Sequence, residues 1–217
     1  HELKTPMTSM KVLADSLVGQ QGVPEDLYQE FMRDITAEID RENRIITDLL
    51  TLVKMDKKNA DLQIQHMSIN QLLEDILKRL RPIADKRNFD LILDSFRPVE
   101  ADVDELKFTS AISNLVENAI KYNVDDGWVR VSLDADHKFF YVTVADSGMG
   151  IPEDSLSRIF ERFYRVDKSH SREIGGTGLG LAITRSTIGM HHGVIKVFSK
   201  EGEGTTFSVR VPLSYIP

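Results

Sequence analysis

The sequence contains no cysteine, so neither a disulfide framework nor a thiolate metal site is available to it. Basic residues are in the minority, because 27 Lys and Arg face 34 Asp and Glu, and the net charge of −7 argues against a nucleic-acid-binding surface. No apolar run reaches the roughly 20 residues that a membrane-spanning helix needs. With 41% hydrophobic and 28% charged residues, the 217-residue chain has the composition of a globular protein with a sizeable core.

The first part of the chain is predicted to form a helical hairpin. Apolar residues recur at intervals of three and four in residues 1–18 and again in residues 27–55, with glycines and Pro24 between the two stretches. Pro24 followed by Glu25 and Asp26 is typical of a helix start. Residues 1–58 offer no second layer to cover either apolar stripe, so we expect a second copy to complete a dimeric four-helix bundle. The alternative is that the hairpin packs on the rest of the same chain.

From residue 59 to residue 217 the pattern changes to short strands alternating with long helices. Strands are predicted at 62–66, 89–93, 128–133, 139–145, 194–198 and 206–211, and helices at 69–86, 103–122 and 178–191. Long helices gathered on one face of a mixed, largely antiparallel sheet make a two-layer α/β sandwich, and the fold class is therefore α+β.

Two glycine-rich runs are candidate phosphate or nucleotide sites. The first, Asp-Ser-Gly-Met-Gly, begins at Asp146, and the second, Gly-Gly-Thr-Gly-Leu-Gly, begins at Gly175 and precedes a predicted helix. Backbone amides at a helix entrance can bind phosphate oxygens. The second run lacks the Lys-Ser/Thr ending of a P-loop and does not follow a strand as a dinucleotide fingerprint would. Taken alone, either run is as compatible with simple turns.

Read with the run Asn-Leu-Val-Glu-Asn-Ala-Ile-Lys-Tyr of residues 114–122, the glycine runs resemble in order and spacing the nucleotide-binding blocks of the GHKL (Bergerat) ATP-binding fold. Residues 159–165 resemble the aromatic block that precedes the ATP lid of histidine kinases. The opening hexapeptide, His-Glu-Leu-Lys-Thr-Pro, is similar to the phosphoacceptor box of sensor histidine kinases of two-component systems. The resemblance implies a HisKA dimerisation and phosphotransfer domain at 1–58, a HATPase catalytic domain at 59–217, and a protein-histidine kinase that uses ATP and Mg²⁺.

The resemblance also implies roles for individual residues. Asp146 would accept a hydrogen bond from the adenine amino group, while Gly148 and Gly150 let the backbone approach the nucleotide. Asn118 would be the protein ligand of Mg²⁺, with Asn114 one turn earlier on the same helical face. The other predicted nucleotide contacts are Lys121, Tyr122, Phe160, Arg165, Lys168, Gly176, Thr177, Gly178, Leu179, Gly180, Leu181 and Thr206. Thr206 is expected to hydrogen-bond the Asp146 carboxylate.

His1 is the predicted phosphoacceptor. The hexapeptide begins like the zinc motif H-E-x-x-H, but Thr5 stands where the second histidine ligand would be, which argues against zinc chemistry. An imidazole can attack phosphorus through one nitrogen while the other keeps its proton, and Glu2 is the candidate base for that proton. Thr5 lies one turn from His1, and the resemblance implies that it orients water for hydrolysis of a partner's aspartyl phosphate.

Three rival functions stay open. A GHKL-type ATPase carries a glutamate four residues before its metal-binding asparagine, where this chain has Asn114, and Glu117 stands in the wrong register to replace it. A non-catalytic dimerisation scaffold would tolerate degenerate blocks, but none of the blocks here is degenerate. A serine kinase on this fold would not need the His1 hairpin. We therefore expect ATP-dependent autophosphorylation on His1 and transfer to an aspartate of a response regulator.

The expected partners are a second copy of the chain and a receiver domain, with no nucleic acid. Because the chain begins with histidine rather than methionine, we expect an upstream sensor or membrane region to be missing, and this part to be the cytoplasmic portion of a membrane-anchored bacterial sensor. The other histidines are not expected to bind metal. His191 and His192 end a predicted helix, where the helix dipole favours an imidazolium.

Overall fold

The computed structural model describes residues 8, 11, 12, 14–16, 18, 24–55, 62–166 and 176–216. The predicted positions of His1, Glu2, Thr5 and Lys168 lie outside this set. The chain divides into two compact units, His1–Thr51 and Leu52–Pro217. The boundary expected between residues 58 and 59 falls among residues outside the described set and stays a prediction.

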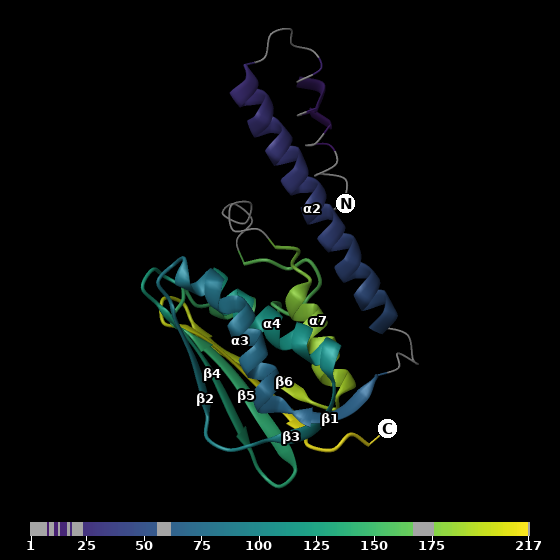
Figure 1. Cartoon of the computed structure of the whole chain (residues 1–217), viewed down its shortest axis with the longest axis vertical. Helices are drawn as coiled ribbons and strands as arrows, with labels where there is room; N and C mark the ends of the chain where they lie inside the picture. The colour runs from purple at the N-terminus through teal and green to yellow at the C-terminus, as the bar shows by residue number, and fades with distance from the viewer. Residues whose placement is uncertain are drawn as a thin grey trace. The chain divides into compact units, whose positions relative to one another are not determined.

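Helix α2, Glu25–Met55, dominates the first unit (Figure 1). It begins where predicted, because Pro24 cannot donate to a preceding turn and its carbonyl accepts from the Tyr28 N–H at 3.0 Å. Along this helix Met32, Ile39, Ile46 and Val53 recur every seven residues, and each is 42–54% exposed. An exposed apolar residue every seven positions marks one side of the helix, as one of the two apolar positions of a coiled-coil heptad does.

The second unit is a two-layer α+β sandwich, as predicted. Its main sheet has the strand order β2-β4-β5-β7-β6, with β2 parallel to β4 and the other pairs antiparallel. The strands are β2 Asp90–Ser95, β4 Trp128–Ala135, β5 Phe139–Asp146, β6 Val194–Lys200 and β7 Gly204–Pro212. Helices α3 Ile69–Asp85, α4 Glu105–Lys121 and α7 Gly180–Met190 lie on one face of this sheet (Figure 1). The short helix α5, Glu153–Leu156, follows the first glycine run.

A separate two-stranded sheet joins β1, Ile64–Ser68, to β3, Glu100–Asp104. Strand β3 was not predicted, because three of its five residues are acidic and the apolar pattern was assigned to the following helix. Ser68 and Asp104 then cap α3 and α4, since their side chains accept from the backbone N–H of Gln71 and Lys107. Both helices therefore start at a strand end, which fixes where their residues face the sheet.

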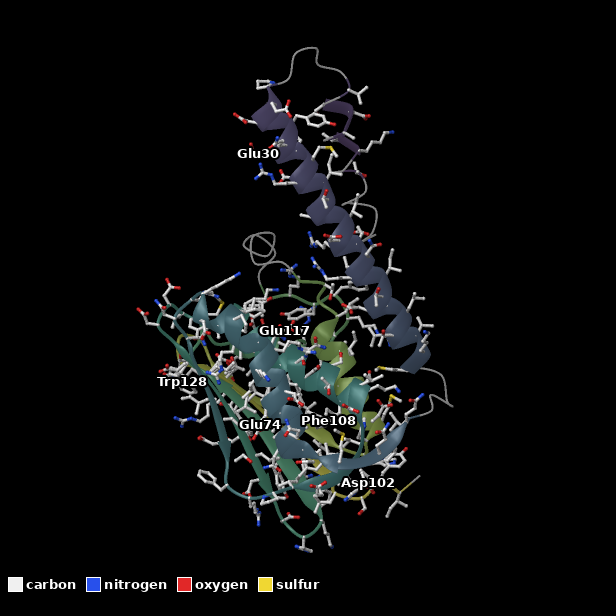
Figure 2. The ribbon with its side chains drawn as sticks, in the orientation of Figure 1. Glu30, Glu74, Asp102, Phe108, Glu117 and Trp128 are labelled. Atoms are coloured by element: carbon white, nitrogen blue, oxygen red, sulfur yellow. The ribbon has the colours of Figure 1, made fainter. Side chains whose placement is uncertain are left out.

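The core lies between the helices and the sheet. Strand β5 alternates buried and partly exposed residues, as a strand with one covered face does. Phe108 of α4, labelled in Figure 2, is fully buried. It meets Phe140 of β5 edge to face, with ring centroids 5.6 Å apart. This packing fixes α4, and with it the asparagines on that helix, against the strand that ends at Asp146.

His191 is not the protonated helix end that the sequence suggested. It is 1% exposed, its Nδ1–H donates to the Thr187 carbonyl at 2.8 Å, and its Nε2 accepts from the Asp104 N–H at 2.9 Å. That pair of bonds requires the neutral imidazole. Burial lowers the pKa of His191; the hydrogen bond to the Thr187 carbonyl and the nearby Asp104 oppose the shift, while Lys107 and His192 reinforce it. His191 thus ties the end of α7 to the start of α4.

The buried His191 predicts a loss of stability in acid. A histidine whose pKa is lowered on folding takes up its proton first in the unfolded chain, so its contribution is full above pH of about 6.5 and falls below it. We expect His191→Gln to destabilise the protein at pH 7.5 and to remove part of the decline in unfolding free energy between pH 7 and pH 5. Urea unfolding of both proteins at several pH values measures this. Parallel pH profiles would contradict the neutral buried imidazole.

Candidate nucleotide site

Asp146 ends strand β5 and is held in place by the backbone. Its Oδ1 accepts the Gly148 N–H at 2.8 Å and the Thr205 N–H at 3.3 Å, and the residue is 9% exposed. The structure shows no hydrogen bond to its Oδ2 among the described residues. Burial raises the pKa of Asp146 to about 6, against the lowering effect of the two N–H donors. The second carboxylate oxygen is therefore available to an external donor.

The predicted hydrogen bond from Thr206 to Asp146 is not formed, and the preceding residue, Thr205, contacts the carboxylate instead. Strand register places Asp146 opposite Thr205, whereas Thr206 lies opposite Ala145 and points to the other face of the sheet. Thr205 is buried, its N–H reaches the carboxylate, and its hydroxyl is 2.8 Å from that of Ser199. Ser199 also accepts the N–H of Ile151, so the strand pair β6–β7 supports the loop after Asp146 from behind. The contact that Asp146 receives from β7 is thus the backbone N–H of Thr205 and not the Thr206 hydroxyl.

The glycines of the first run make room for close backbone contacts. A Cβ at Gly148 would clash with the Tyr122 carbonyl and lie 2.7 Å from the Asp146 Oδ1. Gly150 has a φ of +70°, and a Cβ there would overlap the Lys200 carbonyl. The Met149 N–H donates to the Tyr122 carbonyl at 3.0 Å. The end of α4 and the loop after β5 are thus in direct contact, which joins two of the predicted blocks.

Helix α4 also contacts the second glycine run. Asn114 donates from Nδ2 to the Gly180 carbonyl at 3.3 Å, and Thr184 donates to the same carbonyl at 2.9 Å. Lys121 approaches the other end of the run, because a Cβ at Gly176 would lie 2.6 Å from its Nζ. Asn118 lies between Asn114 and Lys121 on the helix, is half-buried, and has no side-chain hydrogen bond with any described residue. Its amide is thus free to serve a ligand.

The second glycine run is also attached to the aromatic block. The Phe163 N–H donates to the Gly178 carbonyl at 2.9 Å, and Arg165 donates from Nη1 to the Gly176 carbonyl at 3.0 Å. Gly178 has a φ of +71°, a conformation that other residues rarely adopt. Thr177 accepts the Leu179 N–H at 3.2 Å, and Leu179 is fully buried at the start of α7. The four predicted blocks therefore meet, although they are up to 66 residues apart in sequence.

Phe160 and Leu181, two of the predicted nucleotide-contacting residues, pack against other side chains of the unit. Phe160 meets Phe207 edge to face at 6.4 Å, and the guanidinium of Arg185 lies over its ring. Leu181 packs against the core from the first turn of α7. Their contact with nucleotide stays a prediction.

The residues present suit a nucleotide with Mg²⁺. The free Oδ2 of Asp146 matches an amino donor, and the uncommitted Asn118 amide matches a hard cation that takes oxygen ligands. Among the described residues there is no cluster of three His, Cys, Asp or Glu that could bind a metal by itself. A metal at Asn118 would therefore need phosphate oxygens and water as its other ligands.

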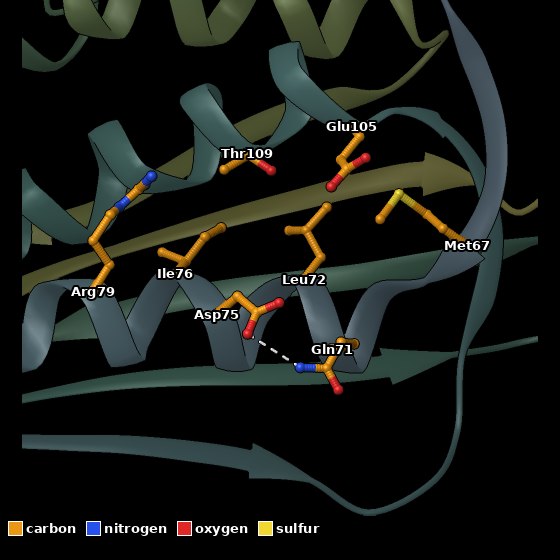
Figure 3. A pocket seen from close by; sticks show the side chains of 8 residues that line it. All are labelled: Met67, Gln71, Leu72, Asp75, Ile76, Arg79, Glu105 and Thr109. Carbon is orange, nitrogen blue, oxygen red and sulfur yellow. Dashed lines mark hydrogen bonds between the residues drawn. The ribbon is translucent and has the colours of Figure 1, made fainter.

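A groove of about 200 Å³ lies elsewhere, between α3 and α4 (Figure 3). Its lining is Met67, Gln71, Leu72, Asp75, Ile76, Arg79, Glu105 and Thr109. None of these belongs to the four blocks, and the Gln71 amide donates to Asp75 within the groove. We therefore place no nucleotide chemistry there.

Comparison with known proteins gives consistent matches to both units. Residues 103–215 match the family described as histidine kinase-, DNA gyrase B-, and HSP90-like ATPase, and residues 1–58 match the His Kinase A (phospho-acceptor) domain. The chain is 34% identical to the sensor histidine kinase WalK of Bacillus subtilis over 98% of this chain and 35% of WalK. It is 34% identical to the sensor-like histidine kinase SenX3 of Mycolicibacterium smegmatis over 98% of this chain and 55% of SenX3. The chain thus spans about a third to a half of these relatives.

Solved structures share the fold. The Acinetobacter baumannii histidine kinase AdeS superposes with a TM-score of 0.80 at 21% identity, covering 98% of each chain. The catalytic domain of histidine kinase ThkA superposes with a TM-score of 0.63 at 26% identity, covering 70% of this chain and 99% of that domain. ThkA in complex with the response regulator TrrA gives a TM-score of 0.80 at 23% identity, covering 98% of this chain and 59% of that one.

Proposed function

The chain belongs to the histidine kinase family, with both its phosphoacceptor and its ATP-binding domain, and we propose that it phosphorylates itself on His1 from Mg²⁺-bound ATP. The phosphoryl group would then pass to an aspartate of a response-regulator receiver domain. The observation that carries the ATP-binding part is Asp146, a buried carboxylate with one oxygen held by two backbone N–H groups and the other free. A free oxygen in such a place accepts a charge-assisted hydrogen bond from an adenine amino group.

The other blocks suit the phosphate end of the nucleotide. Asn118 would hold Mg²⁺, whose role is to offset charge on the phosphate oxygens. Lys121, next to Gly176, and Arg165, bonded to the Gly176 carbonyl, bring positive charge to the glycine run that precedes α7. One imidazole nitrogen of His1 would bond to the γ-phosphorus as the bond to the ADP oxygen breaks. The proton on the other nitrogen would be held by Glu2.

Water is not expected to compete well for the γ-phosphoryl group. Asn114 occupies the position of the ATPase glutamate, and its amide is committed to the Gly180 carbonyl. An amide cannot take a proton from water. Burial raises the pKa of Glu117, and the positive charges of Arg79 on α3 and of Lys121 oppose that shift. The amide at position 114 favours the kinase over a GHKL-type ATPase, and the contacts among the four blocks favour it over a non-catalytic scaffold.

We further propose that the chain works as a homodimer. The exposed apolar side of α2, formed by Met32, Ile39, Ile46 and Val53, is the surface that a second copy would cover. The structure of ThkA with the response regulator TrrA supports a receiver domain as the phosphotransfer partner. No described helix is long and apolar enough to cross a membrane. Because the chain spans only part of its relatives, an upstream sensor and membrane anchor also belong to the proposal.

Nucleotide affinity should depend on the ionisation of Asp146. Its pKa of about 6 means that the carboxyl is mostly ionised at pH 7.5 and mostly protonated at pH 5. We expect affinity for ADP with Mg²⁺ to fall about tenfold between these pH values, because only the ionised group makes the charge-assisted bond. Calorimetric titration across this range measures it. An affinity independent of pH would contradict the assignment of Asp146 to adenine.

The proposed activity is tested by asking which phosphate of labelled ATP becomes attached to the protein. The chain, extended upstream so that His1 is not terminal, is incubated with Mg²⁺ and ATP labelled at either the γ- or the α-phosphate. We expect protein-bound label from γ-labelled ATP alone, and its transfer to a receiver domain added afterwards. Release of inorganic phosphate without protein label would favour the ATPase instead.

The phosphatase role proposed for Thr5 has its own test. We expect Thr5→Ala to keep the autokinase activity and to slow dephosphorylation of the receiver domain, because the hydroxyl that would orient water is lost. An unchanged dephosphorylation rate would remove this role.

A further inference from the structure

Asn123 follows the end of α4 and has no part in the four blocks. It is 5% exposed, and both the oxygen and the nitrogen of its amide are hydrogen-bonded. Its Oδ1 accepts the Val124 N–H at 3.0 Å and the Ser147 hydroxyl at 3.1 Å, and its Nδ2 donates to the Trp128 carbonyl at 3.0 Å. The orientation of the amide is fixed, because a flipped group would set a donor against Val124 N–H and an acceptor against the carbonyl.

These bonds tie three segments together at one point. Asn123 is two residues after Lys121 on the α4 side, Trp128 begins β4, and Ser147 lies between Asp146 and Gly148. Ser147 closes the network, since its Oγ accepts the Trp128 N–H at 2.9 Å. The absence of a side chain at Gly127 makes room for these bonds, because a Cβ there would clash with the Asn123 Oδ1 and lie 2.7 Å from the Ser147 Oγ.

We infer that Asn123 is a positioning residue for nucleotide binding, which acts through Ser147 to set the loop carrying Asp146 against the helix carrying Asn118. The inference rests on the proposed function. Asn123 reaches neither the free Oδ2 of Asp146 nor the Asn118 amide by any described bond, so it makes no contact assigned to the nucleotide. Asn123 would set the distance between the loop that carries Asp146 and the helix that carries Asn118. That distance matters because the adenine end and the phosphate end of one nucleotide must each reach the group assigned to it.

Asn70 offers a matched control in the same unit. Both ends of its amide are also hydrogen-bonded: Nδ2 donates to the Ser95 hydroxyl at 2.5 Å and the Arg97 carbonyl at 2.9 Å, and Oδ1 accepts the Val99 N–H at 2.7 Å. These partners lie away from the four blocks. Asn70→Ala therefore removes a comparable set of bonds, and a general loss of stability would be seen in both variants.

The test is calorimetric titration of ADP with Mg²⁺ into the whole chain and its Asn123→Ala, Asn70→Ala, Ser147→Ala and Asn123→Ala/Ser147→Ala variants. We expect Asn123→Ala to weaken binding about tenfold, as for loss of a well-placed hydrogen-bond network, while Asn70→Ala binds as the parent does. The double variant should bind about as Asn123→Ala does, because both substitutions break one connection. If Asn123→Ala does not fold, Ser147→Ala carries the comparison, with an expected loss of severalfold.

Two results would overturn the inference: equal affinity of the Asn123→Ala and Asn70→Ala proteins, or losses from Asn123→Ala and Ser147→Ala that simply multiply in the double variant. Failure of the parent chain to bind ADP would instead count against the proposed function itself. The two failures are thus distinguishable in the same titrations.

Discussion

Replacement of Asp146 by asparagine is expected to weaken binding of ATP with Mg²⁺ by about 10- to 100-fold or more. The backbone N–H groups of Gly148 and Thr205 require an acceptor, so the asparagine oxygen takes the place of Oδ1. Its amide nitrogen, a donor, then stands where the adenine amino group must donate. Loss of a charge-assisted hydrogen bond costs roughly 1.5–3 kcal/mol, and each 1.4 kcal/mol is about a factor of ten in affinity.

The same substitution should stabilise the nucleotide-free protein. The pKa of Asp146 rises on folding, so protonation favours the folded state as pH falls through about 6 towards the unfolded value near 4. Above pH 6 the buried charge is a cost, which asparagine removes. We expect a gain in unfolding free energy of about 1–3 kcal/mol at pH 7.5, which shrinks as the pH falls and is small only below the unfolded pKa, at about pH 3.

Asp136 supplies the matched control. Its carboxylate also accepts two backbone N–H groups, from Lys138 and Phe139, but it is exposed, and the Tyr141 hydroxyl helps to lower its pKa to about 2. Asp136→Asn should lower stability at pH 7.5 and leave nucleotide affinity unchanged. Titration calorimetry measures the nucleotide affinity of each variant, and urea unfolding measures its unfolding free energy. Unchanged nucleotide binding in Asp146→Asn would refute the adenine assignment.

Substitution of Gly148 by alanine is expected to abolish measurable nucleotide binding. The added methyl group would meet the Tyr122 carbonyl and the Asp146 Oδ1, both of which are held by other bonds. Relief of the clash must separate the loop from α4 or turn the carboxylate. Overpacking of this kind costs about 1–3 kcal/mol of stability, and the displaced carboxylate removes about 100-fold or more in affinity.

Gly189 is the matched glycine. It lies near the end of α7, and a Cβ there meets nothing within 4 Å. Gly189→Ala should raise the unfolding free energy by about 0.5–1 kcal/mol, since alanine is the better helix former, and should leave nucleotide affinity unchanged. Comparable binding by the two alanine variants would show that the close contact at Gly148 does not shape the site.

Periodicity and motif order predicted most of the fold. The predicted ends of the three helices on the sheet agree with the observed ends to within about two residues, because the apolar faces of these helices repeat regularly. Strand β3 was missed because its sequence, Glu-Ala-Asp-Val-Asp, carries charge at alternate positions and only two apolar residues. It pairs with β1 alone, so it has none of the apolar character of a central strand.

The site could be predicted at the level of blocks but not of hydrogen bonds. Thr205 and Thr206 are adjacent, and only the pairing of β7 with β5 decides which one faces Asp146. Asn123 and Ser199 give no local signal, because each serves a partner 24 or more residues away. The position of His191 at a predicted helix end does not indicate its burial against α4 and β3. Tertiary packing decides which distant groups a buried polar side chain bonds to, and those partners cannot be predicted from a single sequence.

The γ-phosphoryl group of ATP is expected to end on His1. The most direct measurement is the chemical stability of the protein-bound label in the upstream-extended chain and in its His1→Gln variant. A phosphorylated imidazole is a phosphoramidate, so we predict label that is lost in acid, survives alkali, and is absent from His1→Gln. Label that is stable in acid, or that persists in His1→Gln, would contradict the account.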